Sequence, residues 1–156
     1  MFSFRLLLVL SALLSSGIAA CGRGEPDIDP ELEPILQEYL DHAPTVGNLS
    51  SLVSLKIGIP DESDPTHLAG KCVKTPWGYG EVRVGIDLKI TVAPIDVGSA
   101  QFKATVFHEL AHCLHNFDHN EEDKDAIMAP SNTSPKGFWE VHLYEKLLQM
   151  FREGRK

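Results

Sequence analysis

The chain has 156 residues, of which 43% are hydrophobic and 23% charged, and it carries a net charge of −8. This apolar fraction excludes an intrinsically disordered chain, and the length suits a single domain with one core. The 22 acidic side chains outnumber the 14 basic ones, and the basic residues form no patch in the sequence. We therefore do not expect nucleic acid as a partner.

The first 20 residues are typical of an export signal. A single positive charge at Arg5 precedes an apolar stretch from Leu6 to Ala20 that is interrupted only by small residues. The stretch is too short for an ordinary membrane span. We therefore expect residues 1–20 to be a signal peptide.

The end of this signal carries a second pattern. Ile18-Ala19-Ala20-Cys21 resembles the bacterial lipobox. The resemblance implies a lipid anchor on Cys21 that attaches the protein to the membrane of the bacterial cell envelope. By the sorting rule for such lipoproteins, Gly22 implies the outer membrane if the cell has two membranes. The alternative is cleavage after Ala20, which gives a soluble periplasmic or secreted protein.

Residues 21–30 are expected to form the lipid-anchored linker, and residues 31–156 the folded domain. The domain should begin with a helix over residues 31–42, because apolar residues recur there on one helical face. A strand is expected over residues 52–59, where polar and apolar side chains alternate. The apolar set of this strand is Val53, Leu55, Ile57 and Ile59.

Two further strands and their connection are expected next. A polar loop over residues 61–70 leads to strands over residues 71–75 and 81–87. The segment Pro76-Trp77-Gly78-Tyr79-Gly80 between them is predicted to be a turn, because proline and glycine favour turns. Lys89 to Val92 is either a short strand of its own or a continuation of the strand before it.

A longer helix is predicted from Ser99 to His115. Ser99 is a good N-cap, and no proline or glycine interrupts the segment. One apolar stripe runs along this helix and should be buried. Its members are Phe102, Val106, Leu110 and Cys113.

The helix carries the motif His108-Glu109-Leu110-Ala111-His112, and its two histidines lie on the face opposite the apolar stripe. Residues four apart lie on one helical face, so His108 and His112 can bind a single metal ion. Neutral imidazoles suit zinc. Glu109 lies about 100° around the helix, beside the metal, where it can act as general base on a zinc-bound water. The spacing therefore predicts a catalytic zinc site.

The segment from His108 to His119 resembles the metzincin clan of zinc proteases, whose pattern is H-E-x-x-H-x-x-G-x-x-H. Here His115 stands in place of the glycine, and Asp118 stands in place of the third histidine. Either Asp118 is the third ligand, or the turn comes one residue later at Asn116 and His119 is the ligand. We favour His119, because asparagine tolerates the left-handed backbone of such a turn.

Ile127-Met128-Ala129-Pro130 resembles the methionine turn of the same clan. The resemblance implies that Met128 lies beneath the zinc ligands; the alternative is an ordinary core methionine. No tyrosine lies two residues after Met128, so zinc and Glu109 would have to stabilise an oxyanion together with backbone donors.

A closing helix is predicted over residues 137–153. The side chains expected to point largely inward are Phe138, Val141, Leu143, Tyr144, Leu147, Leu148 and Phe151. The order of elements predicts an α+β fold that resembles a minimal metzincin, with a small mixed sheet, an N-terminal helix, an active-site helix, a Met-turn and a C-terminal helix. In that clan an edge strand runs along the cleft, and we expect residues 81–87 to have this role.

The remaining cysteines, Cys72 and Cys113, lie on a predicted strand and on the motif helix. An exported protein can keep a disulfide, so a bridge between these two residues is favoured over two buried thiols.

These features predict an exported zinc endopeptidase that acts on a peptide or protein substrate, with Zn²⁺ as cofactor and Glu109 as general base. Two alternatives remain open. One is a zinc-binding lipoprotein without proteolytic activity, and the other is a zinc hydrolase of non-peptide amides or esters.

Overall fold

A computed structural model describes residues 25–43, 51–58, 69–79, 82–94, 96–131 and 134–154, with side chains described outside residues 77–87. The predicted signal peptide and Cys21 lie outside these residues. Among the described residues, no helix has the length and apolar character needed to cross a membrane.

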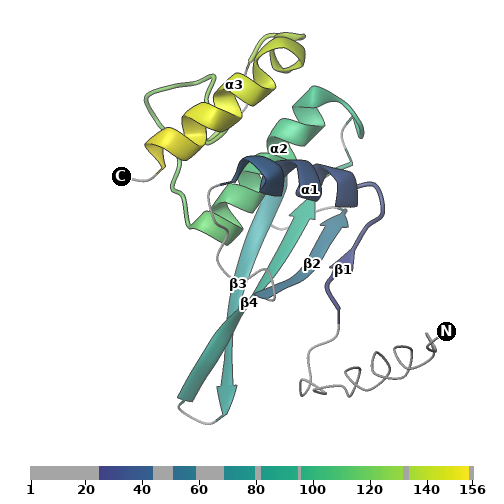
Figure 1. The fold of residues 1–156 in the computed structure, drawn as a ribbon, viewed down its shortest axis with the longest axis vertical. Coiled ribbons are helices and arrows are strands. Elements are labelled where there is room, and N and C mark those ends of the chain that lie inside the picture. The colour runs from purple at the N-terminus through teal and green to yellow at the C-terminus, as the bar shows by residue number, and fades with distance from the viewer. Residues whose placement is uncertain are drawn as a thin grey trace, which may run out of the picture.

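The described part has an α+β fold, as predicted, with helices packed on a small mixed sheet. In chain order the elements are β1 (Asp27–Ile28), α1 (Glu33–His42), β2 (Leu52–Ile57), β3 (Gly70–Tyr79), β4 (Val82–Val92), α2 (Ala100–Leu110), the π-helical turn η3 (Ala111–His115) and α3 (Phe138–Glu153). Figure 1 shows α1 and α2 lying across the sheet, while α3 packs against α2 away from the tip of the β3–β4 hairpin.

The strand order is β1-β2-β4-β3. β1, β2 and β4 are parallel, and β3 joins β4 antiparallel at the edge of the sheet. Residues 88–92 of β4 lie between β2 and β3, whereas residues 82–87 pair with β3 alone in the described part of the chain. The edge strand along the cleft was expected at residues 81–87, but the described cleft wall belongs to another strand. That edge strand is β3, which in the described residues pairs with β4 alone. The sequence pattern of a strand does not reveal its neighbours, which explains the error.

The connection between β3 and β4 also differs from the prediction. β3 continues through Pro76 to Tyr79, and β4 begins at Val82, so the turn predicted over residues 76–80 is largely strand. A proline is tolerated on an edge strand, since its missing N–H costs no hydrogen bond where no neighbour accepts it. Lys89 to Val92 continues β4.

β2 departs from a simple alternation. Leu52 and Leu55 are both buried, although they are three residues apart. The register between β2 and β4 shifts between Leu52 and Ser54, and such a bulge moves the residues before it onto the opposite face. The predicted apolar set, which contained Leu55 but not Leu52, is therefore wrong at its start.

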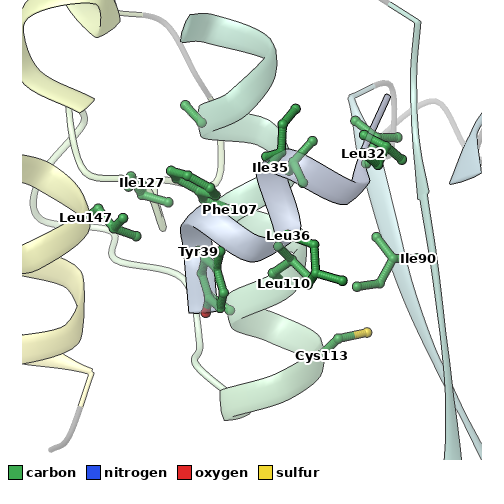
Figure 2. Packing of buried hydrophobic residues seen from close by; sticks show 14 of the residues in the cluster. Leu32, Ile35, Leu36, Tyr39, Ile90, Phe107, Leu110, Cys113, Ile127 and Leu147 are labelled. Carbon is green, nitrogen blue, oxygen red and sulfur yellow. The ribbon is translucent and has the colours of Figure 1, made fainter. Parts of the chain in front are cut away.

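Helix α2 forms the centre of the core. Its predicted stripe of Phe102, Val106, Leu110 and Cys113 is at most 5% exposed. Phe107 on another side is also fully buried, and its ring centroid lies 5.5 Å from that of Tyr39 of α1. Figure 2 shows both residues among the buried side chains between the helices. Because α2 is buried on several sides, few of its side chains can reach solvent. Functional side chains are therefore confined to one edge of this helix.

Helix α3 buries a narrower face than predicted. Its buried residues are Trp139, Leu143, Leu147, Met150 and Phe151. Val141, Tyr144 and Leu148 were expected to point inward, but they are 75%, 48% and 48% exposed. The predicted set covered most of the helix circumference, whereas packing against one neighbouring helix covers only one stripe.

Candidate metal centre

The predicted motif helix does not run as one α-helix to His115. α2 ends at Leu110, and residues 111–115 form the π-helical turn η3. Its C-cap is Asn116, whose φ of 59° and ψ of 35° are left-handed. A π turn holds one residue more than an α turn, so the chain leaves the helix one residue later than the metzincin pattern would require. The predicted left-handed turn at Asn116 is confirmed.

The turn at Asn116 brings three histidines together. His108, His112 and His119 form a group in which one ring nitrogen of each lies within 4.8 Å of the others. Their rings are close, with centroids 4.5 to 5.2 Å apart. Among the described residues Asp118 is not part of this group, and neither is His115. The structure thus places His119, rather than the alternative Asp118, beside the two motif histidines.

The two motif histidines are oriented by backbone carbonyls. Nδ1 of His108 lies 2.7 Å from the carbonyl oxygen of Ile127, and Nδ1 of His112 lies 2.6 Å from that of Phe117. A carbonyl can only accept, so each Nδ1 carries the proton and donates it. Both Nε2 atoms are then left with a free lone pair, the state a metal ligand needs.

These two lone pairs face each other. The Nε2 atoms of His108 and His112 are 2.9 Å apart. Two acceptor nitrogens at this distance repel each other unless a proton or a cation lies between them. Burial lowers the pKa of His108 to about 4, and burial also lowers the pKa of His112. A proton is therefore a poor bridge near neutral pH, and the arrangement fits a metal cation.

The segment predicted as a methionine turn supports both sides of this group. The carbonyl of Ile127 accepts the bond from His108, and the next carbonyl, that of Met128, accepts a 2.8 Å hydrogen bond from the N–H of Asn120. Asn120 directly follows His119. Met128 itself is buried, at 4% exposure. One short turn thus fixes the first histidine and the loop that carries the third.

His115 lies away from the histidine group. It is half-buried among the rings of Tyr39, Phe117 and Phe151. Its Nε2 is buried without a hydrogen-bond partner, and burial lowers its pKa. Its place on η3 turns the ring toward these aromatic side chains.

Glu109 is the buried charged residue of the described core, at 6% exposure. Burial raises its pKa to about 7, and a hydrogen bond from the backbone N–H of Cys72 opposes that rise. Gly70 lies directly against it: a Cβ at this position would come within 2.6 Å of Cγ and Oε1 of Glu109. A carboxyl group with a pKa near neutrality is suited to both take up and release a proton.

This buried carboxyl group predicts a pH-dependent stability difference. The folded pKa of about 7 lies above the ordinary value of 4.5. The cost of burying the charge is therefore absent below pH 4.5, grows as the pH rises, and is fully present above pH 7. Metal-free Glu109→Gln protein should be more stable than metal-free wild type at pH 8, by roughly 3 kcal/mol, and similar to it at pH 4. Urea unfolding at the two pH values measures this difference, and an equal difference at both would contradict the assignment.

Two of the three histidines, His112 and His119, line a cleft of about 670 Å³. One wall is β3, which contributes residues from Gly70 to Lys74, and the other is the loop from Asn116 to His119. Glu109 also lines the cleft. A disulfide between Cys72 and Cys113 joins β3 to the end of the site helix, with the two Cα atoms 5.7 Å apart. The bridge favoured from the sequence is thus present in the structure.

Sequence reasoning missed several residues around the site. The carbonyls of Ile127 and Phe117 carry no side-chain signal, and Gly70 is indistinguishable in sequence from any loop glycine. Lys74 reaches across the cleft, where its Nζ donates a 2.6 Å hydrogen bond to Oδ1 of Asn116. Gly70 and Lys74 reach the site because β3 lies at the sheet edge, and that pairing is not encoded locally.

No protein-family model, curated protein or solved structure matches this chain significantly.

Proposed function

We propose that this protein is a zinc-dependent endopeptidase in which His108, His112 and His119 hold the metal and Glu109 acts as general base. The observation that carries the proposal is the convergence of three histidine nitrogens within 4.8 Å, next to a buried carboxyl group, on the wall of an open cleft. The resemblance of residues 108–130 to metzincins points to the same reaction.

Zinc is the metal that the donor set fits best. Three imidazoles with no carboxylate in the group suit zinc, whereas calcium and magnesium prefer oxygen ligands. Three protein ligands leave a fourth position open, which is the arrangement of catalytic rather than structural zinc sites. His119 is exposed and lines the cleft together with His112, so the histidine group is open to the cleft rather than enclosed in the core.

When bound, zinc would lower the pKa of a water molecule and polarise a substrate carbonyl. The chain supplies the proton transfers. Glu109 directly follows His108 and lines the cleft with His112, so its carboxylate would accept a proton from the attacking water and pass it to the leaving amine. Ile127 and Phe117 hold the histidine rings, so the site needs little reorganisation.

A peptide substrate fits the shape of the cleft. β3 is an edge strand that lines the cleft, and in the described residues its second edge pairs with no other strand. An extended peptide can pair with such an edge, so that its backbone rather than its sequence provides the main recognition. This arrangement favours a peptide over a small amide or ester, although the catalytic groups would serve either substrate.

The sequence patterns complete the proposal. Met128 would have the role of the methionine in the metzincin turn, which agrees with its burial and with the hydrogen bonds of its segment. The signal of residues 1–20 and the lipobox at Cys21 would place the enzyme on the bacterial cell envelope as a lipoprotein, with the soluble exported form as the alternative.

A zinc-binding protein without activity is the second candidate. Burial of Glu109 speaks against it, because a structural metal site gains nothing from a buried carboxyl group whose ionisation costs stability.

The proposal is tested with purified wild-type protein and a panel of unfolded proteins as substrates. We expect cleavage within the substrate chains, its loss after treatment with a zinc chelator, and its recovery when zinc is added back. Cleavage that survives complete metal removal, or a zinc-loaded protein that cleaves nothing in the panel, would contradict the proposal.

A further inference from the structure

One face of β3 meets the site helix at three successive points, which we call the β3 seam. Gly70, Cys72 and Lys74 are two residues apart along the strand, so they lie on the same face of it. Their partners lie one helical turn apart along α2 and its end. The three pairs are Gly70 with Glu109, Cys72 with Cys113, and Lys74 with Asn116.

The first contact bears directly on the carboxyl group of Glu109. Because Gly70 has no Cβ, the Glu109 side chain can lie against the strand backbone, where a Cβ would come 2.6 Å from Cγ and Oε1 and 2.8 Å from Cδ. The backbone of Gly70 does not have a positive φ, so its conformation alone does not require glycine. Glycine is required at position 70 because the Glu109 side chain occupies the space of a Cβ atom.

The second contact fixes the strand relative to Glu109. The backbone N–H of Cys72 donates a hydrogen bond to the Glu109 carboxylate. The side chain of the same residue is bonded to Cys113, which points from the helix toward the sheet (Figure 2). The disulfide therefore holds a hydrogen-bond donor for Glu109 at a set place, one helical turn from that residue.

The third contact closes the seam at the far end of the cleft. The ammonium group of Lys74 bonds to Asn116, the left-handed residue from which the chain turns back toward His119. β3 is thereby joined to both ends of the site, to the residue beside His108 and to the turn before the third histidine.

We propose that Gly70 and the backbone N–H of Cys72, held in place by the Cys72–Cys113 bridge, are positioning elements that set the Glu109 carboxylate for proton transfer. The inference rests on the proposed peptidase function. It assigns to β3 a part in the reaction beyond pairing with a substrate, and it explains why a glycine stands at the point where the edge strand begins.

The test is Gly70→Ala in the full chain. The added methyl group must displace the Glu109 side chain, so kcat should fall roughly 10- to 100-fold. KM and the affinity for zinc should change less than about threefold, because no metal ligand is touched. Gly58→Ala is the matched control, since a Cβ there meets only Cγ2 of Thr91 at an ordinary 3.5 Å, and it should leave kcat unchanged.

A second variant separates positioning from general stability. Shortening Glu109 by one methylene makes room for the methyl group, so Gly70→Ala should have little further effect on kcat or on the unfolding free energy in a Glu109→Asp background. If Gly70→Ala alone fails to fold, recovery of folding and zinc binding in the double variant supports the contact, and continued failure overturns it. Wild-type kcat in zinc-loaded Gly70→Ala overturns the positioning role, whereas an inactive wild type overturns the proposed function itself.

Discussion

Glu109→Gln protein should bind zinc as tightly as the wild type and yet lose roughly 10²- to 10⁴-fold in kcat. Glutamine has nearly the same shape as glutamate and can still accept the hydrogen bond from the N–H of Cys72, but it cannot take up a proton. The change therefore removes the general base and keeps the site. Steady-state kinetics on a peptide substrate, with zinc content measured on the same sample, gives the result.

A matched control for this variant is Glu140→Gln, which changes an exposed glutamate on α3. It should leave both kcat and zinc content at the wild-type values. A Glu109→Gln enzyme that turns over at the wild-type rate would remove Glu109 from the mechanism. Loss of zinc together with activity would show that Glu109 supports the metal rather than the proton transfer.

His119→Ala protein should bind zinc more than about 100-fold more weakly than the wild type. Loss of a partner that merely orients a ligand costs 10- to 100-fold in affinity, so loss of a ligand should exceed that range. Asp118→Ala should cost less than about tenfold, because Asp118 is outside the histidine group, although its charge acts on His112. Competition with a chromogenic chelator measures both dissociation constants.

The order of these two effects decides the third ligand. A larger loss from Asp118→Ala than from His119→Ala would mean that the carboxylate binds the metal and that the turn at Asn116 does not set the ligand. His42→Ala, which changes an exposed histidine on α1, is the control and should leave zinc affinity unchanged.

The parts of the site predicted from sequence depend on local structure. The spacing of His108 and His112 follows from helix geometry, and the Ser99 cap forms as expected, with its Oγ accepting a hydrogen bond from the N–H of Phe102. The left-handed turn follows from the tolerance of Asn116 for such a backbone. These properties belong to a few neighbouring residues, so the sequence alone can carry them.

The parts that could not be predicted depend on contacts between distant segments. That β3 rather than residues 81–87 lines the cleft depends on how the hairpin joins β2, which no local pattern states. The same holds for Gly70, whose role becomes visible only when Glu109 is beside it. The exposure of Val141 and Leu148 likewise depends on how much of α3 its neighbours cover.

Crystallography of the zinc-loaded protein, with anomalous scattering recorded at the zinc edge, tests the central claim most directly. We expect one anomalous peak at roughly 2.0–2.1 Å from a ring nitrogen of each of His108, His112 and His119, with a position open to the cleft beside Glu109. A peak bound by other residues, or no peak among these three histidines at saturating zinc, would contradict the account.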